Sequence, residues 1–198
     1  LPICRYSIFL TQLGHRLTLL DTSENCLKLA NEKAKEVGIA FDGTYCRNAT
    51  NLSIFENNYF DAVLNFGPYY HLKNESARNR VAEETIRVTK PEGLIFSTFL
   101  NRYSLVRYGA KARPESYIED PEIVESVLEK GFGFSALPSA RFVNTCYFQD
   151  PTKIELFFNG LGIITQSIIG CEGVVSEVEE KLNSLDSAAF KKWVELNY

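Results

Sequence analysis

The chain has 198 residues, of which 45% are hydrophobic and 23% charged, a composition that excludes intrinsic disorder and suffices for a substantial core. Its net charge of −4 argues against nucleic acid as a partner, because phosphate binding requires an excess of Lys and Arg on one face. No apolar run is long enough to span a bilayer, so a membrane is not an expected partner either. We predict a single domain over residues 1–198.

Five cysteines occur singly, without a Cys-X-X-Cys pair or a nearby pair of histidines. This pattern predicts reduced thiols in a cytoplasmic protein and no metal site. The chain contains no methionine. We therefore expect the sequence to be incomplete, either as an internal fragment or because methionine positions were lost in transcription.

The first part of the chain alternates helical and extended patterns. A short helix is predicted near residues 5–13, followed by a strand at 16–20 that is apolar enough to be buried on both faces. Apolar residues at helical spacing predict a helix over 23–37, with Ser23 near its N-cap. A weaker strand is expected at 41–46, and a polar loop at 48–58.

The middle of the chain continues the alternation. Residues 60–67 form a strong strand pattern that ends in a glycine turn, 75–89 a helical pattern stopped by Pro91 and Gly93, and 93–101 another strand. Helical crossovers between apolar strands predict an α/β fold with a mostly parallel central sheet flanked by helices.

Residues 103–147 change character and read as a cap or lid inserted after this sheet, with a helix near 120–130. Its aromatic residues suggest a cover over a small, partly apolar molecule, or simply the packing core of the cap. They are Tyr103, Tyr108, Tyr117, Phe132, Phe134, Phe142, Tyr147 and Phe148. A local basic patch that could contact phosphate is expected around Arg102, Arg107, Lys111 and Arg113.

The last part of the chain is predicted to contain a helix at 151–161, an apolar strand at 163–170 and an amphipathic helix at 176–196. The final helix is a candidate contact in a homodimer.

The run Leu17 to Leu20 ends in Asp21, with Thr22 and Ser23 at the start of the following helical pattern. In nucleotide-binding α/β units an acid at this place accepts hydrogen bonds from ribose hydroxyls at the carboxyl edge of the sheet. The alternative is a surface acid that caps the following helix.

Three stretches together resemble the class I S-adenosylmethionine-dependent methyltransferases over most of residues 5–101: "GHRLTLLDTS", "FDAVLNFGPYYHL" and "EETIRVTKPEGLIFSTFLNRY". The segment "GPYYHL" resembles small-molecule members of the family with a Gly-Pro-X-Tyr-His-Leu turn. The resemblance implies a Rossmann-like methyltransferase fold with a cap after strand five. It also implies S-adenosylmethionine as cofactor, no metal, and direct displacement of the methyl group by a small-molecule acceptor.

The resemblance also implies functional residues. Those that match cofactor-binding positions are Arg5, Tyr6, Asp21, Thr22, Ser23, Asn48, Ala49, Asn65, Phe66 and Gly67. Asn48 stands where the family usually has an acid beside the adenine, and an ordinary Asx turn is an equal interpretation. His71 and Tyr70 are the catalytic candidates. His71 is either a base for the acceptor proton or a structural residue bonded to a backbone carbonyl, and Tyr70 is expected to pack against cofactor or acceptor.

The chain departs from the family in several places. "LPIC" stands where the glycine-rich loop is expected before Arg5, the first and last strands of the fold are missing, and Glu92 replaces a glycine of the usual Lys-Pro-Gly-Gly turn. Two other functions therefore stay open. One is a degenerate methyltransferase-like domain that binds a partner without catalysis, and the other is a Rossmann-type protein that binds a nicotinamide cofactor.

Overall fold

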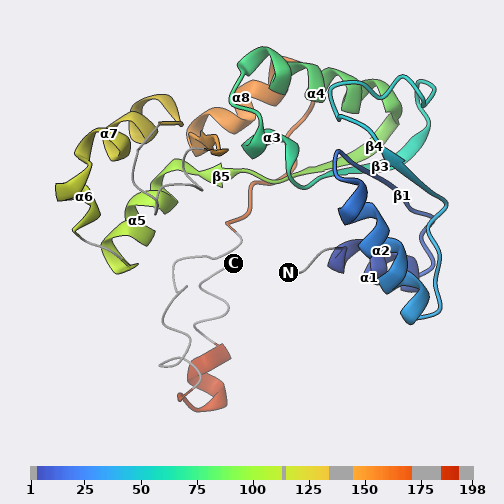
Figure 1. Ribbon diagram of the computed structural model, residues 1–198, viewed down its shortest axis with the longest axis horizontal. Coiled ribbons are helices and arrows are strands. Elements are labelled where there is room, and N and C mark those ends of the chain that lie inside the picture. Colours follow the sequence, from blue (N-terminus) through green and yellow to red (C-terminus); the bar gives the residue numbers. More distant parts are fainter. Residues whose placement is uncertain (1–3, 113–114, 134–144, 171–183, 192–198) are drawn as a thin grey trace. The chain divides into compact units, whose positions relative to one another are not determined.

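The computed structural model describes residues 4–112, 115–133, 145–170 and 184–191 (Figure 1). The chain divides into two compact units, residues 1–154 and 155–198, and each is described by itself.

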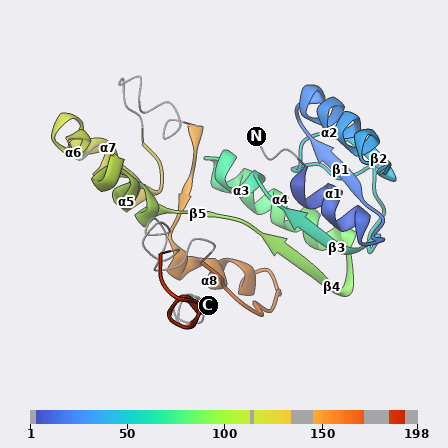
Figure 2. The same cartoon turned by 90° about the horizontal axis from the view of Figure 1, so that it is seen from below.

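The first unit begins with a parallel pair of strands and two helices. Its elements are α1 (Arg5–Gln12), β1 (Thr18–Asp21), α2 (Glu24–Glu36) and β2 (Gly43–Cys46). Figure 2 shows α2 lying along β1 and β2, and its Leu27, Ala30 and Ala34 are buried as their spacing predicts. Ser23 caps α2 by accepting a hydrogen bond from the Cys26 N–H. The predicted burial of β1 on both faces is wrong, because residues 18–20 are only half-buried.

A second parallel pair follows in the same unit. It comprises β3 (Phe60–Asn65), α3 (Pro68–His71), α4 (Glu75–Val88) and β4 (Thr89–Ser97). Helix α4 lies along this pair (Figures 1 and 2) and buries Val81, Ala82 and Val88. The register shifts between Phe60 opposite Thr89 and Ala62 opposite Leu94, because the Lys-Pro-Glu-Gly segment adds residues to β4.

The prediction of parallel strands is confirmed, but not as one continuous sheet. Among the described residues the strands form three separate two-stranded ladders, β1 with β2, β3 with β4 and β5 with β6. The chain between Cys46 and Phe60 connects the β1–β2 ladder to the β3–β4 ladder.

The predicted cap is more helical than its composition indicates. It lies between β5 (Leu100–Asn101) and β6 (Phe148–Gln149), and its helices are α5 (Arg102–Ala112), α6 (Ser116–Glu119) and α7 (Pro121–Lys130). The helix near 120–130 is confirmed as α7, whereas α5 was not predicted. The core of this region consists of two aliphatic side chains, one cysteine and one aromatic ring, namely Ile123, Val127, Cys146 and Phe148.

Among the described residues, the cap's aromatic side chains differ in burial. Phe148 is in the core, whereas Tyr103 and Phe132 are exposed. The side chains of Tyr108 and Tyr117, and all of Phe134 and Phe142, lie outside the described part.

Arg102 is not part of a basic surface patch. It is 6% exposed, donates to the Leu128 carbonyl at 2.7 Å and forms an ion pair with Asp150 at 3.7 Å. Its guanidinium therefore caps the C-terminal carbonyls of α7, where a cation is favoured. The side chains of Lys111 and Arg113 lie outside the described residues.

The predicted helix at 151–161 is present as η3 (Pro151–Lys153) and α8 (Ile154–Asn159), so that α8 begins at the last residue of the first unit. In the second unit the predicted strand at 163–170 is wrong: these residues have no regular structure, and Ile164, Ile168 and Ile169 are exposed. An apolar run becomes a strand only where a neighbouring strand completes its hydrogen bonds.

The final predicted helix lies partly outside the described residues. Within them, residues 184–186 are not helical and residues 187–191 are. No helix in the described ranges is long and apolar enough to cross a membrane.

Candidate functional site

Asp21 ends β1 at the carboxyl edge of the first ladder and is exposed. Its Oδ1 accepts the Ser23 N–H at 2.8 Å, and within the described residues no group bonds to Oδ2. The carboxylate is therefore held in place by the turn before α2 while one oxygen stays open to a ligand. Thr22 is exposed beside it, and Ser23 is occupied as the N-cap of α2. Asp21 thus does not cap α2 through its own side chain.

The loop after β2 starts beside Asp21. Cys46 is the register partner of Asp21, and the Arg47 N–H donates to the Asp21 carbonyl at 3.0 Å. Asn48 follows, with its Oδ1 accepting both the N–H and the hydroxyl of Thr50 at 3.0 Å. The Asx turn predicted as one interpretation of Asn48 is thus confirmed. Its amide N–H₂ group has no partner among the described residues, so the turn directs a donor to this edge next to the half-buried Ala49.

The start of α1 lies near the same edge. The Tyr6 ring meets the Phe66 ring edge-on, with centroids 5.3 Å apart, so the residues after β3 contact the first turn of α1. Burial raises the pKa of the Cys4 thiol, and the charges of Lys33 and Asp21 act on it in opposite directions. Arg5 is exposed.

Asn65 has a different surrounding from its neighbours Phe66 and Gly67. It is 7% exposed, and its amide donates to the Thr85 hydroxyl of α4 at 2.9 Å. Its carbonyl accepts the Thr98 N–H after β4. The side chain predicted to bind cofactor thus lies within the β3–α4 interface, while its backbone holds the loop after β4.

Gly67 forms the turn from β3 into α3 with φ of 150° and ψ of −52°, a conformation open to glycine and costly for other residues. The N–H groups of Tyr70 and His71 both donate to its carbonyl at 3.2 Å. A methyl group at its Cα would be 3.9 Å from the His71 ring and 4.0 Å from the Tyr70 hydroxyl. The structure therefore brings both catalytic candidates to the glycine turn at the end of β3.

The two catalytic candidates differ in what holds them. The exposed His71 ring lies 4.7 Å from the Tyr70 ring, and in the described part of the chain its imidazole makes no hydrogen bond. Among the described residues no backbone carbonyl bonds to this imidazole, and both interpretations of His71, base and structural residue, stay predictions. Burial raises the pKa of Tyr70, an effect that nearby Cys146 increases and a hydrogen bond to Thr98 opposes. Its phenol accordingly stays protonated at neutral pH.

Three residues near this turn, Tyr147, Arg78 and Thr98, were not predicted from the sequence as part of the site. The Tyr147 N–H donates to the Tyr70 carbonyl at 2.8 Å, and the Arg78 guanidinium lies 3.6 Å from the centre of the Tyr147 ring. Thr98 contacts both Tyr70 and Asn65. The sequence marks Tyr147 only as one aromatic residue of the cap, and no local pattern indicates its contact with a turn far away in sequence.

Residues 3–97 match the sequence model of a family described as a methyltransferase domain. A tRNA (carboxymethyluridine(34)-5-O)-methyltransferase from Arabidopsis thaliana is 31% identical over 78 residues, 39% of this chain and 17% of that protein. The ubiquinone/menaquinone biosynthesis C-methyltransferase UbiE of Edwardsiella ictaluri is 26% identical over 134 residues, 67% of this chain and 51% of that protein. The chain thus spans about half or less of the curated relatives that it matches.

Among solved structures, an S-adenosylmethionine-dependent methyltransferase from Methanosarcina mazei has a TM-score of 0.58 with 19% sequence identity. The match covers 78% of this chain and 72% of that chain. Residues 3–97 therefore carry the sequence pattern of a methyltransferase domain, and the chain has the Rossmann-like fold of the S-adenosylmethionine-dependent methyltransferases.

Proposed function

We propose that the chain is the cofactor-binding and catalytic part of an S-adenosylmethionine-dependent methyltransferase. The observation that supports this most is the placement of Asp21, Asn48 and the Gly67–His71 turn at the carboxyl ends of their strands. Ligands of open α/β sheets bind at such ends. The residues fit the cofactor. Asp21 offers an open carboxylate oxygen to a ribose, and Gly67 has no side chain that would occupy the space beside the turn.

We infer that these residues mainly bind and orient. Asp21 accepts hydrogen bonds from the ribose hydroxyls, and the Asn48 amide donates a hydrogen bond to the adenine edge. Phe66 and Tyr6 form an aromatic wall beside them. The cofactor supplies an activated methyl group, so the bond from sulfur to methyl breaks as the acceptor's bond to methyl forms. His71 accepts the acceptor's proton, and the protonated Tyr70 donates a hydrogen bond that orients the acceptor.

We propose a small molecule as the acceptor, in a protein of the cytoplasm. The net charge of −4 supports a small acceptor over an RNA surface, because RNA binding needs a basic face. The cap reaches the catalytic turn through Tyr147, so the acceptor is expected to lie where Tyr70, His71 and the cap meet. A homodimer through the last helix stays a prediction.

Calorimetric titration with S-adenosylhomocysteine tests the cofactor site. We expect the wild type to bind, and Asp21→Ala to bind at least about tenfold more weakly through loss of the ribose contacts. Asp61→Ala is the matched control, because Asp61 is also an exposed acid of a strand but lies at the amino end of β3, paired with Lys90. Its affinity should stay within about twofold of the wild type.

Three outcomes would contradict the proposal. Equal affinity of Asp21→Ala and wild type would remove Asp21 from the site. Binding of a nicotinamide dinucleotide in place of S-adenosylhomocysteine would favour the other cofactor class. If neither ligand binds, a degenerate domain that recognises a partner becomes the better interpretation.

A further inference from the structure

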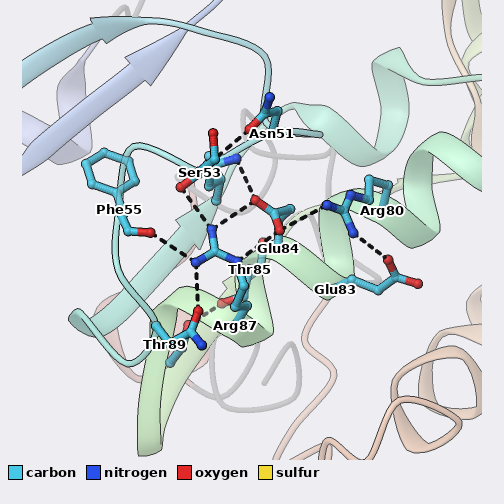
Figure 3. Close-up of polar contacts among 11 residues, drawn as sticks. Asn51, Ser53, Phe55, Arg80, Glu83, Glu84, Thr85, Arg87 and Thr89 are labelled. Carbon is cyan, nitrogen blue, oxygen red and sulfur yellow. Dashed lines mark hydrogen bonds and ion pairs between the residues drawn. The ribbon is translucent and has the colours of Figure 1, made fainter.

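The molecule contains a buried acid that the methyl-transfer site does not use. Glu84 of α4 is 3% exposed, and a carboxylate at that depth must be compensated by positive charge and hydrogen bonds. Its partners are Arg87, Arg80 and the loop of residues 47–59 between β2 and β3, the β2–β3 loop, as Figure 3 shows.

The Arg87 guanidinium binds both carboxylate oxygens of Glu84. Nε donates to Oε1 at 3.0 Å and Nη2 donates to Oε2 at 3.0 Å. Glu84 Oε2 also accepts the Leu52 N–H at 2.6 Å, so the carboxylate is bonded to the loop as well as to its own helix. Hydrogen bonding to Arg87 lowers the pKa of Glu84, and the pair stays ionised at neutral pH.

The remaining donors of Arg87 all reach the same loop. Nη2 donates to the Leu52 carbonyl at 2.9 Å, and Nη1 donates to the Phe55 carbonyl at 3.0 Å and to Asn57 Oδ1 at 2.9 Å. With the two bonds to Glu84, each of the five guanidinium N–H groups has an acceptor. A lysine has only three N–H donors on one nitrogen and cannot satisfy this arrangement.

This loop carries the residues proposed to face the adenine. The Asn51 N–H donates to the Asn48 carbonyl at 3.0 Å, and the next residue is Leu52, whose N–H and carbonyl are bonded by Glu84 and Arg87. The Asn48 turn is thus connected to α4 through a short, hydrogen-bonded segment. Helix α4 also carries Thr85, which binds Asn65 just before the catalytic turn.

We propose that Glu84 and Arg87 are positioning residues that set the β2–β3 loop against the β3–β4 ladder for adenine recognition. This inference rests on the proposed cofactor site. The loop connects β2 directly to β3, and no ladder joins β1–β2 to β3–β4 within the described ranges, so the loop's conformation contributes to how Asn48 stands relative to Gly67. The pair acts on the cofactor through the loop and touches neither the cofactor nor the acceptor.

The test is calorimetry with S-adenosylhomocysteine and its deaminated analogue S-inosylhomocysteine, at a temperature where circular dichroism shows every variant folded. Hypoxanthine carries a hydrogen on N1, where adenine has an acceptor, so their affinity ratio reports on adenine recognition. We expect Arg87→Lys to weaken the binding of S-adenosylhomocysteine about tenfold or more. The binding of S-inosylhomocysteine should weaken much less, so that the preference for adenine is reduced. Arg80→Ala is the matched control, because Arg80 is on the same helix and meets the same carboxylate at 3.4 Å but, among the described residues, forms no hydrogen bond with the loop.

Arg80→Ala should keep both affinities within about twofold of the wild type. If Arg87→Lys only lowers the melting temperature and keeps the wild-type preference for adenine, the pair is structural and the inference is overturned. If the wild type itself does not bind S-adenosylhomocysteine, the proposed function has failed, and that result is distinct from failure of the variant.

A second variant covers the case in which Arg87→Lys does not fold. Asn57→Ala removes one exposed acceptor of Arg87 from the loop and leaves Glu84 compensated. We expect it to weaken S-adenosylhomocysteine binding by about two- to fivefold and to reduce the adenine preference in the same direction. Unchanged affinity and preference in Asn57→Ala would then overturn the inference.

Discussion

Two acids of the first unit show that the carboxyl and amino ends of its strands differ in structure. Asp21, at the carboxyl end of β1, is exposed and has one oxygen bonded to Ser23 and one open among the described residues. Glu84, near the end of α4 that leads into β4, is buried and receives Arg87 on both oxygens together with the Leu52 N–H. An acid whose bonds are completed by the protein stabilises the fold, whereas one left partly unpaired at a strand end can bind a ligand.

The same contrast extends to the turns at the two ends. At the carboxyl end, a methyl group added to the Gly67 Cα would come no closer than 3.9 Å to the His71 ring and 4.0 Å to the Tyr70 hydroxyl. At the amino end, a methyl group on Gly93 would stand 2.8 Å from the Lys90 carbonyl and 2.9 Å from the Asp61 carbonyl. There is therefore space beside Gly67 at the carboxyl end, whereas Gly93 at the amino end is packed tightly against the backbone.

The largest expected effect on stability comes from removing the Arg87 side chain. Arg87→Ala leaves the buried Glu84 without its bidentate partner and should lower the free energy of unfolding by about 3–5 kcal/mol. Urea denaturation followed by circular dichroism measures it. Arg80→Ala, which removes only the outer ion pair, should cost less than about 1 kcal/mol. Equal losses in the two variants would contradict the distinction between them.

Adding a side-chain carbon at Gly93 should have the next largest effect on stability. Gly93→Ala places a Cβ against two backbone carbonyls that cannot move independently, and we expect a loss of about 1–3 kcal/mol in unfolding free energy. Gly160→Ala is the comparison, since its nearest carbonyl is 3.4 Å away. Thermal denaturation of both variants measures the difference, and a Gly93→Ala protein as stable as the wild type would show that this turn is not tightly packed.

The Glu84 charge can be removed without removing the side chain. Glu84→Gln should cost about 1–2 kcal/mol at pH 7, because a charged hydrogen bond is replaced by a neutral one. The pKa of Glu84 is lowered in the folded protein, so its stabilisation is present above the ordinary glutamate pKa of about 4.3 and is lost as the pH falls below it.

The stability difference between wild type and Glu84→Gln should therefore shrink between about pH 5 and pH 3, measured by urea denaturation at each pH. Asp61 and Asp150, whose pKa values are also lowered, are present in both proteins, and their contributions cancel in the difference. A difference that stays constant over this whole range would mean that the Glu84 carboxylate does not contribute through its charge.

The smallest effect is expected at Glu92, the position where the family turn usually has glycine. Glu92 has φ of 62°, which strains a residue with a side chain, so Glu92→Gly should stabilise the fold by about 0.5–1 kcal/mol after the entropy of the unfolded glycine is counted. Asn58 has a similar φ of 55°, but asparagine tolerates this region, and Asn58→Gly should change stability less. The ranking of the two melting temperatures checks this.

Local patterns were sufficient for the elements that carry the cofactor candidates. The spacing of Leu27, Ala30 and Ala34 predicted α2, Ser23 marked its start, and the apolar run before it placed Asp21 at the end of β1. These features depend on neighbours within one or two turns of chain, so they are legible in the sequence. The strand predicted at 163–170 failed because a strand also needs a partner, which the run itself does not specify.

The sequence by itself determined the order of the main helices and strands from α1 to β4, the parallel character of the ladders and the position of Asp21 at a strand end. Only the tertiary structure showed that the Asn65 side chain is committed to Thr85, that Tyr147 holds Tyr70, and that Arg87 binds a loop as far as 35 positions earlier, at Leu52. Contacts over such separations follow from how the elements pack, and packing leaves no periodic trace in the sequence of either partner.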